Sequence, residues 1–203
     1  MPLHPIVELR AAAALATPPP PPAGLRPADL VGLVDLSPTL RFDIRYATAN
    51  NFLGSPVYEH ANARLQRPAA TALLRAHQAL AAQGYGLCIF DAYRPWAVTK
   101  VFFDATPPAQ RHFVADPANG SRHNRGCAVD LTLYELATGE VVEMPSGFDE
   151  FTERAYPDWP GGTTRQRWYR ELLRRTMEDA GFTVYEHEWW HFDFRDWRSY
   201  PVQ

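Results

Sequence analysis

One stretch organises the chain: Ser121-Arg122-His123-Asn124-Arg125-Gly126-Cys127-Ala128-Val129-Asp130-Leu131-Thr132-Leu133. It places an imidazole, His123, in a polar loop and a carboxylate, Asp130, in the strand-like run that follows. From Gly126 the pattern has a period of two, so that one face of the predicted strand carries Cys127, Val129, Leu131 and Leu133. Asp130 lies on the other face. A carboxylate in the middle of a strand is costly to bury unless a cation or hydrogen bonds receive it, and we therefore predict a functional site on this face.

A second cluster near the C-terminus completes a candidate metal site. The run Glu188-Trp189-Trp190-His191 supplies another imidazole and another carboxylate. His123, Asp130 and His191 would give a divalent zinc ion three ligands and leave a fourth position for water, with Glu188 free to move the protons of that water. Each of these side chains alone would most often be structural or solvated, so the prediction depends on their occurring together.

The strand predicted around His191 needs an irregularity. Aromatic and polar residues alternate here, in the order Trp190, His191, Phe192, Asp193, Phe194 and Arg195. This alternation puts His191 on the polar face. Glu188 lies three positions before His191, and a regular strand points such positions to opposite faces. We therefore predict a bend or bulge between them.

Length and composition indicate one domain of ordinary globular type. The 203 residues are 46% hydrophobic and 21% charged, and no apolar run reaches the roughly 18 residues that would span a membrane. The net charge of -3 comes from interspersed charges without a basic stripe, which argues against nucleic acid as a partner. Cys88 and Cys127 lie in apolar, strand-like runs and are predicted to be buried thiols.

The N-terminal segment differs from the rest of the chain. Residues 1–24 combine an Ala-rich piece with a run of prolines from Pro18 to Pro22, a composition that favours extended polyproline over a packed element. We therefore expect an N-terminal arm over residues 1–29 and the folded domain over residues 30–203. The run from Ala11 to Ala16 imitates the apolar part of a secretion signal, but it is short and precedes the prolines, so a cytoplasmic location is favoured over a periplasmic one.

Short strands with helices between them predict an α+β domain whose central, mainly antiparallel sheet is flanked by helices. An apolar stripe at helical spacing predicts a helix from Pro68 to a stop at Gly84, followed by a buried strand over residues 85–91. This strand delivers Arg94 to its C-terminal edge, where a rigid scaffold often holds functional side chains. The planar donor fork of Arg94 could stabilise negative charge on a carbonyl oxygen.

The motifs also carry a family resemblance. Ser121-x-His123-x-x-Gly126-x-Ala128-x-Asp130, followed at a distance by Glu188-x-x-His191, resembles the zinc peptidases that cleave D-Ala-D-Ala bonds. Together with Asp91-Ala92-Tyr93-Arg94-Pro95 and Tyr46-Ala47-Thr48-x-x-Asn51-Phe52-x-Gly54, these blocks occur in the order seen in the D-alanyl-D-alanine dipeptidase family, whose members are vancomycin-resistance dipeptidase-like zinc peptidases. The resemblance covers residues 30–200 and implies a fold related to these enzymes and to hedgehog-like domains.

The resemblance implies a role for each site residue. It implies one Zn²⁺ per chain, held by His123, Asp130 and His191. Glu188 matches the general base, and Arg94 matches the residue that stabilises the transition state. The residues that match substrate contacts are Asp149, for the free ammonium of a dipeptide, and Tyr46 and Ser121, which line the pocket.

Two positions depart from the family pattern. Cys127 stands where the family often has Ser or Ala, and Pro145 lies in the loop that leads to Asp149. These departures bear on substrate preference more than on the zinc chemistry.

The function expected from these features is zinc-dependent hydrolysis of the D-Ala-D-Ala dipeptide, or of a closely similar free dipeptide, to two D-amino acids. The expected partner is this small-molecule substrate, and no expectation about the oligomeric state follows. One alternative is a D,D-carboxypeptidase or an L,D-peptidase that acts on longer peptidoglycan stems. Another is a non-catalytic, zinc-stabilised binding module on the same scaffold, although Glu188 and Arg94 argue against it.

Overall fold

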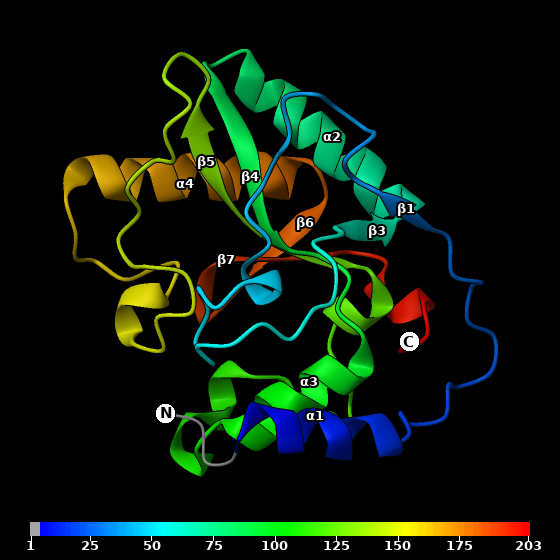
Figure 1. Ribbon diagram of the computed structural model, residues 1–203. Coiled ribbons are helices and arrows are strands. Elements are labelled where there is room, and N and C mark those ends of the chain that lie inside the picture. The colour runs from blue at the N-terminus through cyan, green and yellow to red at the C-terminus, as the bar shows by residue number, and fades with distance from the viewer. Residues whose placement is uncertain (1–4) are drawn as a thin grey trace.

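The centre of the molecule is a five-stranded sheet with the strand order β2-β4-β5-β7-β6, seen in a computed structural model that describes residues 5–203 (Figure 1). Only the β2–β4 pair is parallel, and the other three pairs are antiparallel. The predicted α+β class with a mainly antiparallel sheet is therefore confirmed. The strands of this sheet are β2 (Arg41–Phe42), β4 (Tyr85–Asp91), β5 (Ala128–Glu135), β6 (Phe182–Tyr185) and β7 (Glu188–Phe194). A separate antiparallel pair consists of β1 (Leu30–Gly32) and β3 (Arg64–Gln66).

The helices form two groups at opposite ends of the view in Figure 1. Helices α2 and α4 pack with the sheet around the larger hydrophobic core, and α1 and α3 lie side by side around a smaller one. Their bounds are α1 (Ile6–Leu15), α2 (Arg67–Ala81), α3 (Trp96–Ala105) and α4 (Thr164–Asp179). No helix within residues 5–203 has the length and apolar composition needed to cross a membrane.

Strand β5 has the two faces that its sequence predicts. Its alternate side chains enter the larger core, where Val129, Leu131 and Leu133 are fully buried. Asp130 points away from this core, toward the candidate site. Cys127 and Cys88 are buried free thiols, as predicted. Burial raises the pKa of Cys127 to about 12 and that of Cys88 to about 11, so both thiols stay protonated near neutral pH.

Strand β7 contains the predicted bulge. On the neighbouring strand β6, Val184 pairs with Phe192, but the next residue, Tyr185, pairs with Glu188. The segment between Glu188 and Phe192 therefore bows out of the β6 ladder. This bulge brings Glu188 and His191 to the same side, with Glu188 Oε2 3.8 Å from His191 Nδ1.

The N-terminal segment is not wholly extended, and the expectation of an unpacked arm is wrong for residues 6–15. These residues form α1, whose Leu9 and Ala13 are buried against α3. The run of alanines has high helix propensity, and the two buried residues recur at helical spacing, so a short helix can cover an apolar patch here. The prolines that follow carry no helix or strand, because proline disrupts a helix interior. The domain boundary at residue 30 stays a prediction.

We expect Leu9→Ala to lower the free energy of unfolding by about 2 to 3 kcal/mol, because it removes a buried side chain from the contact between α1 and α3. Val7→Ala in the same helix is the matched control, since Val7 is 79% exposed. The control should change stability by less than about 0.5 kcal/mol. Urea unfolding measures both values, and equal values for the two variants would contradict the packing of α1.

Candidate metal centre and substrate pocket

His123 lies in a short 3-10 turn, His123–Arg125, whose position is fixed by a neighbouring amide. The side chain of Asn124 donates to the carbonyl of Arg94 and to Thr99 Oγ1, both at 2.8 Å. Ser121 supports the turn, because its Oγ accepts a hydrogen bond from the backbone N–H of His123 at 3.2 Å. Gly126 ends the turn at a φ of 65°, a left-handed conformation in which a side chain would be strained.

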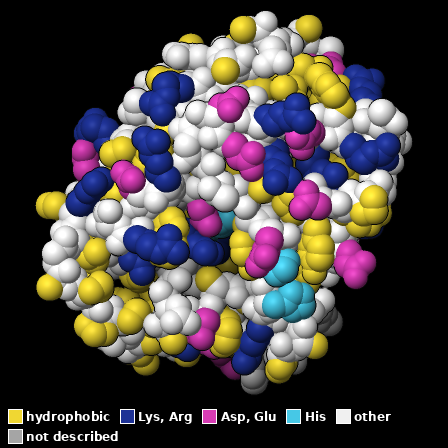
Figure 2. Space-filling view, turned by 180° about the vertical axis from the view of Figure 1, so that it is seen from behind, with side chains coloured by type: hydrophobic (Ala, Val, Ile, Leu, Met, Phe, Trp, Pro, Cys, Tyr) yellow, Lys and Arg dark blue, Asp and Glu magenta, His cyan; other side chains and the backbone are white. Residues whose placement is uncertain are grey.

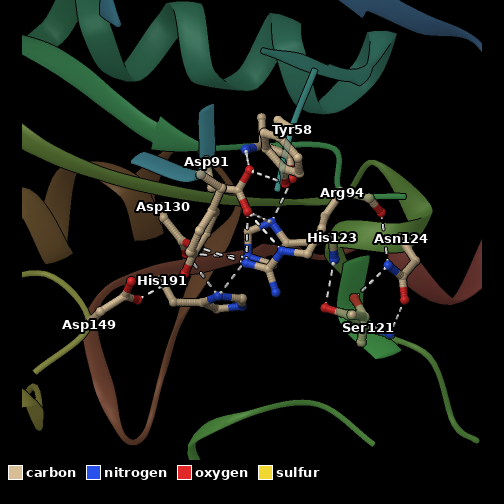
Figure 3. Close-up of polar contacts among 12 residues, drawn as sticks. Tyr58, Asp91, Arg94, Ser121, His123, Asn124, Asp130, Asp149 and His191 are labelled. Atoms are coloured by element: carbon tan, nitrogen blue, oxygen red, sulfur yellow. Dashed lines mark hydrogen bonds and ion pairs between the residues drawn. The ribbon is translucent and has the colours of Figure 1, made fainter. Parts of the chain in front are cut away.

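Three donor atoms from separate parts of the chain meet beside this turn (Figure 3). His123 Nε2 is 3.3 Å from Asp130 Oδ1 and 3.1 Å from His191 Nδ1. Asp130 Oδ1 is 3.0 Å from His191 Nδ1, because Asp130 and His191 are paired across strands β5 and β7. Ligands at about 2.0–2.1 Å from a tetrahedral zinc ion lie about 3.3 Å from one another. The three atoms thus form a possible metal site.

The hydrogen bonds of the two imidazole rings show that the three donor atoms fit a cation. In each ring one nitrogen, here called the inner one, faces the other donors, and the outer one points away. His123 Nδ1 is 2.6 Å from the carbonyl oxygen of Ala92, and His191 Nε2 is 2.9 Å from Asp193 Oδ1. A carbonyl and a carboxylate only accept, so each outer nitrogen carries the hydrogen and each inner nitrogen of a neutral ring presents a lone pair. Asp130 Oδ1 is buried and has no hydrogen-bond partner among residues 5–203. Three lone pairs therefore converge, as a positive ion requires.

The protonation states of His191 and Asp130 also depend on this arrangement. Burial lowers the pKa of His191, but the carboxylates of Asp193 and Asp130 outweigh it and raise that pKa to about 10. Burial raises the pKa of Asp130, but His123 and His191 outweigh it and bring that pKa well below its ordinary value. In the metal-free protein a proton on His191 therefore neutralises part of the negative charge, and metal binding must displace it.

Arg94 is held rigidly next to the donor atoms. Its Nε and Nη2 donate to Asp91 Oδ2 at 2.9 and 2.7 Å, and Nη2 lies 3.6 Å from Asp130 Oδ2. Its guanidinium lies over the rings of Phe102 and Tyr46, at 4.5 and 5.2 Å from the centroids. These contacts use one side of the donor fork and leave Nη1 for another partner.

Glu188 is a buried carboxyl close to the metal donors. Its exposed fraction is 9%. Burial raises the pKa of Glu188 to about 8, with the charge of His191 opposing the shift and those of Asp130 and Asp149 adding to it. A carboxyl with a pKa near neutrality is suited to accept and return a proton.

Asp149 is aimed by an unusual backbone. Its φ is 59°, in the left-handed region that non-glycine residues rarely adopt and that recurs at functional sites. Tyr46 Oη donates to Asp149 Oδ1 at 2.9 Å, and the N–H of Phe52 lies 3.3 Å from Oδ2. Burial nevertheless raises the pKa of Asp149 to about 7.

Every predicted site residue lines one small cavity of about 90 Å³. Figure 2 shows a hollow on this face, with histidine atoms in its depth and charged side chains of both signs around it. Aromatic and polar side chains share the walls. The predicted residues along the cavity are Tyr46, Arg94, Ser121, His123, Asp130, Asp149, Glu188 and His191, and the aromatic ones include Phe52, Phe102, Phe113, Phe151 and Trp190.

Three supporting residues were not predicted from the sequence. Asp91 fixes Arg94, Tyr58 Oη donates to Asp91 Oδ1 at 2.7 Å, and Asp193 orients His191. Asp91 opens the motif that contains Arg94, and Asp193 alternates with His191 in β7, so spacing could have pointed to both. Tyr58 lies in an irregular segment without such a signal.

An α+β sheet that carries two histidines and an aspartate around one point, with a buried glutamate beside them, defines a metallopeptidase-type centre. The Peptidase_M15 family model, described as D-ala-D-ala dipeptidase, matches residues 26–202. The chain belongs to this family.

Two relatives, each more than 30% identical to this chain, agree with this assignment. The D-alanyl-D-alanine dipeptidase of Escherichia coli (strain K12) is 36% identical over 174 residues, which are 86% of this chain and 89% of that protein. The D-alanyl-D-alanine dipeptidase of Enterococcus faecium is 39% identical over 183 residues, which are 80% of this chain and 89% of that protein. A solved structure of the LdcB LD-carboxypeptidase is 21% identical, with a TM-score of 0.48 over 85% of this chain and 71% of that one.

We expect Asp193→Ala to weaken metal binding by about 10- to 100-fold, because it removes the carboxylate that orients His191. Competition with a chelator of known affinity measures this change. Asp196→Ala is the matched control, because Asp196 pairs with Arg26 away from the donor atoms. Unchanged affinity in Asp193→Ala would contradict the orienting role.

We expect the stability of the metal-free protein to fall between pH 5 and pH 8. Folding raises the pKa of Asp149 to about 7 and that of Glu188 to about 8, so the stability from their protonated forms is present below about pH 4 and lost as the pH rises through these values. Asp149→Asn should reduce the fall by roughly 1 to 3 kcal/mol in urea unfolding at the two pH values. Asp158→Asn is the control, since the Asp158 side chain is 86% exposed, and equal slopes for both variants would contradict the shift.

Proposed function

We propose that the protein is a zinc-dependent dipeptidase that hydrolyses D-alanyl-D-alanine, or a closely similar free dipeptide, to two D-amino acids. One observation carries this proposal: the His123, Asp130 and His191 donor atoms, a buried proton-accepting carboxyl and a fixed guanidinium line the same small cavity. The names of the relatives support the choice of substrate.

His123 Nε2, Asp130 Oδ1 and His191 Nδ1 would hold the zinc ion. When bound, zinc supplies a Lewis acid that acidifies water and polarises the carbonyl of the scissile amide. Asp193 and the carbonyl of Ala92 keep both rings in the tautomer that this role needs.

Glu188 is the proposed general base. It takes the proton of the attacking water as the new carbon–oxygen bond forms, and it gives that proton to the nitrogen of the leaving D-alanine as the carbon–nitrogen bond breaks. Arg94 is proposed to stabilise the negative charge that develops on the carbonyl oxygen, using the donor that Asp91 leaves free.

Asp149 is proposed to receive the ammonium group of the substrate. Its carboxylate is oriented by Tyr46 before any substrate binds, which limits the ordering cost of binding. Tyr46 and Ser121 complete the lining, although the recorded hydrogen bonds of Ser121 serve the His123 turn. An ammonium receptor in a cavity of about 90 Å³ favours a free dipeptide over a longer peptidoglycan stem.

The decisive experiment compares peptides with zinc-restored and metal-free protein. We expect zinc-dependent release of D-alanine from D-Ala-D-Ala, and little release from L-Ala-D-Ala, L-Ala-L-Ala or a pentapeptide stem. Glu188→Gln should lower kcat by about 100- to 10,000-fold while zinc binding persists. Glu186→Gln is the matched control, because the side chain of Glu186 is 79% exposed. Equal rates across chirality would overturn the substrate assignment.

A further inference from the structure

Two arginines among the described residues line the cavity. They differ in how many of their guanidinium nitrogens already have partners within the protein. Arg94 is 7% exposed and donates through Nε and Nη2 to Asp91. Arg122 has a side chain that is 39% exposed, and its recorded ion pair joins Nε to Asp193 Oδ2 at 3.4 Å. Both terminal nitrogens of Arg122 are therefore available to a ligand.

Arg122 has a defined position despite this exposure. Arg122 immediately precedes the 3-10 turn that carries His123, and it lies in the chain between two other cavity residues, Ser121 and His123. Its guanidinium lies 5.0 Å from the ring of Trp197 and 6.0 Å from that of Tyr185. Stacking of this kind favours a flat guanidinium with its edge exposed.

The two ends of the proposed substrate need opposite partners. A free dipeptide carries an ammonium at one end and a carboxylate at the other, and each charge loses water when it enters a small cavity. Asp149, on the wall formed with Tyr46 and Phe52, suits the ammonium. A carboxylate close to Asp130, Glu188 and Asp149 would be repelled unless a cation receives it. Arg122 lines the same cavity but contacts other residues than Asp149 does, namely Tyr185 and Asp193.

We propose that Arg122 binds the free C-terminal carboxylate of the substrate through its two terminal nitrogens. This inference rests on the proposed dipeptidase function and deepens it. The fork of a guanidinium matches the two oxygens of a carboxylate, so Arg122 selects substrates in which the scissile bond is followed by one residue with a free carboxyl group. Amidated peptides lack this charge, and extended peptides carry it farther from the scissile bond.

A comparison of two substrates with two proteins isolates this contact. The substrates are D-Ala-D-Ala and its C-terminal amide, assayed with the zinc-loaded wild type and with Arg122→Gln. We expect the wild type to prefer the acid by about 10- to 100-fold in kcat/KM. Arg122→Gln should remove most of this preference, mainly by raising KM for the acid, and Arg122→Lys should restore part of it because it keeps the charge.

Arg198→Gln is the matched control. Arg198 also lies over Trp197, at 4.1 Å, but it is not part of the cavity lining. Its substitution should leave the preference for the acid unchanged.

The outcomes separate this inference from the function on which it rests. If Arg122→Gln lowers kcat/KM equally for acid and amide and weakens zinc binding, Arg122 acts only through Asp193, and the inference is overturned. If the variant keeps the wild-type preference, the inference is likewise overturned. If the zinc-loaded wild type cleaves neither substrate, the proposed function itself fails.

Discussion

The convergence of three lone pairs constrains the rest of this structure. Asp130 Oδ1, His123 Nε2 and His191 Nδ1 lie 3.0 to 3.3 Å apart. Burial removes the water that would relieve the repulsion among these atoms, and in the metal-free protein a proton on His191 relieves part of it instead. The fold withstands this arrangement because the β5–β7 ladder and the turn at Asn124 hold the three side chains from outside. A metal ion would displace the proton on His191 and would be attracted to all three donor atoms at once.

The charge pattern around the convergence follows from burial. Asp149 and Glu188 are carboxyls whose pKa values are raised to about 7 and about 8, whereas Asp130 keeps its negative charge because two imidazoles face it. Three carboxyl groups in one cavity thus have different pKa values and different charges near neutral pH. Arg94 stays charged against Asp91, so the cavity offers a fixed cation beside carboxyls that can change charge.

The sequence predicted correctly those features of the fold and of the site that depend on the period and spacing of residues. The two faces of β5, the strand that ends near Arg94 and the bulge between Glu188 and His191 follow from period and spacing. Asp91 and Asp193 were not predicted, because they act by orienting Arg94 and His191. Such a role depends on a hydrogen bond whose geometry only the folded structure shows. Helix α1 was missed because the proline run dominated the composition of residues 1–24, while the apolar patch that receives Leu9 consists of residues from α3 and other segments distant in the sequence.

Helix α1 lies outside the region that matches the family, yet it packs behind the site. The family match begins at residue 26, beyond the end of this helix. Yet α1 packs on α3, and Phe102 of α3 lies 4.5 Å from the guanidinium of Arg94. A fragment that contained only residues 26–202 would keep every residue of the pocket. It would lose the helix that packs against α3, which carries the pocket residue Phe102.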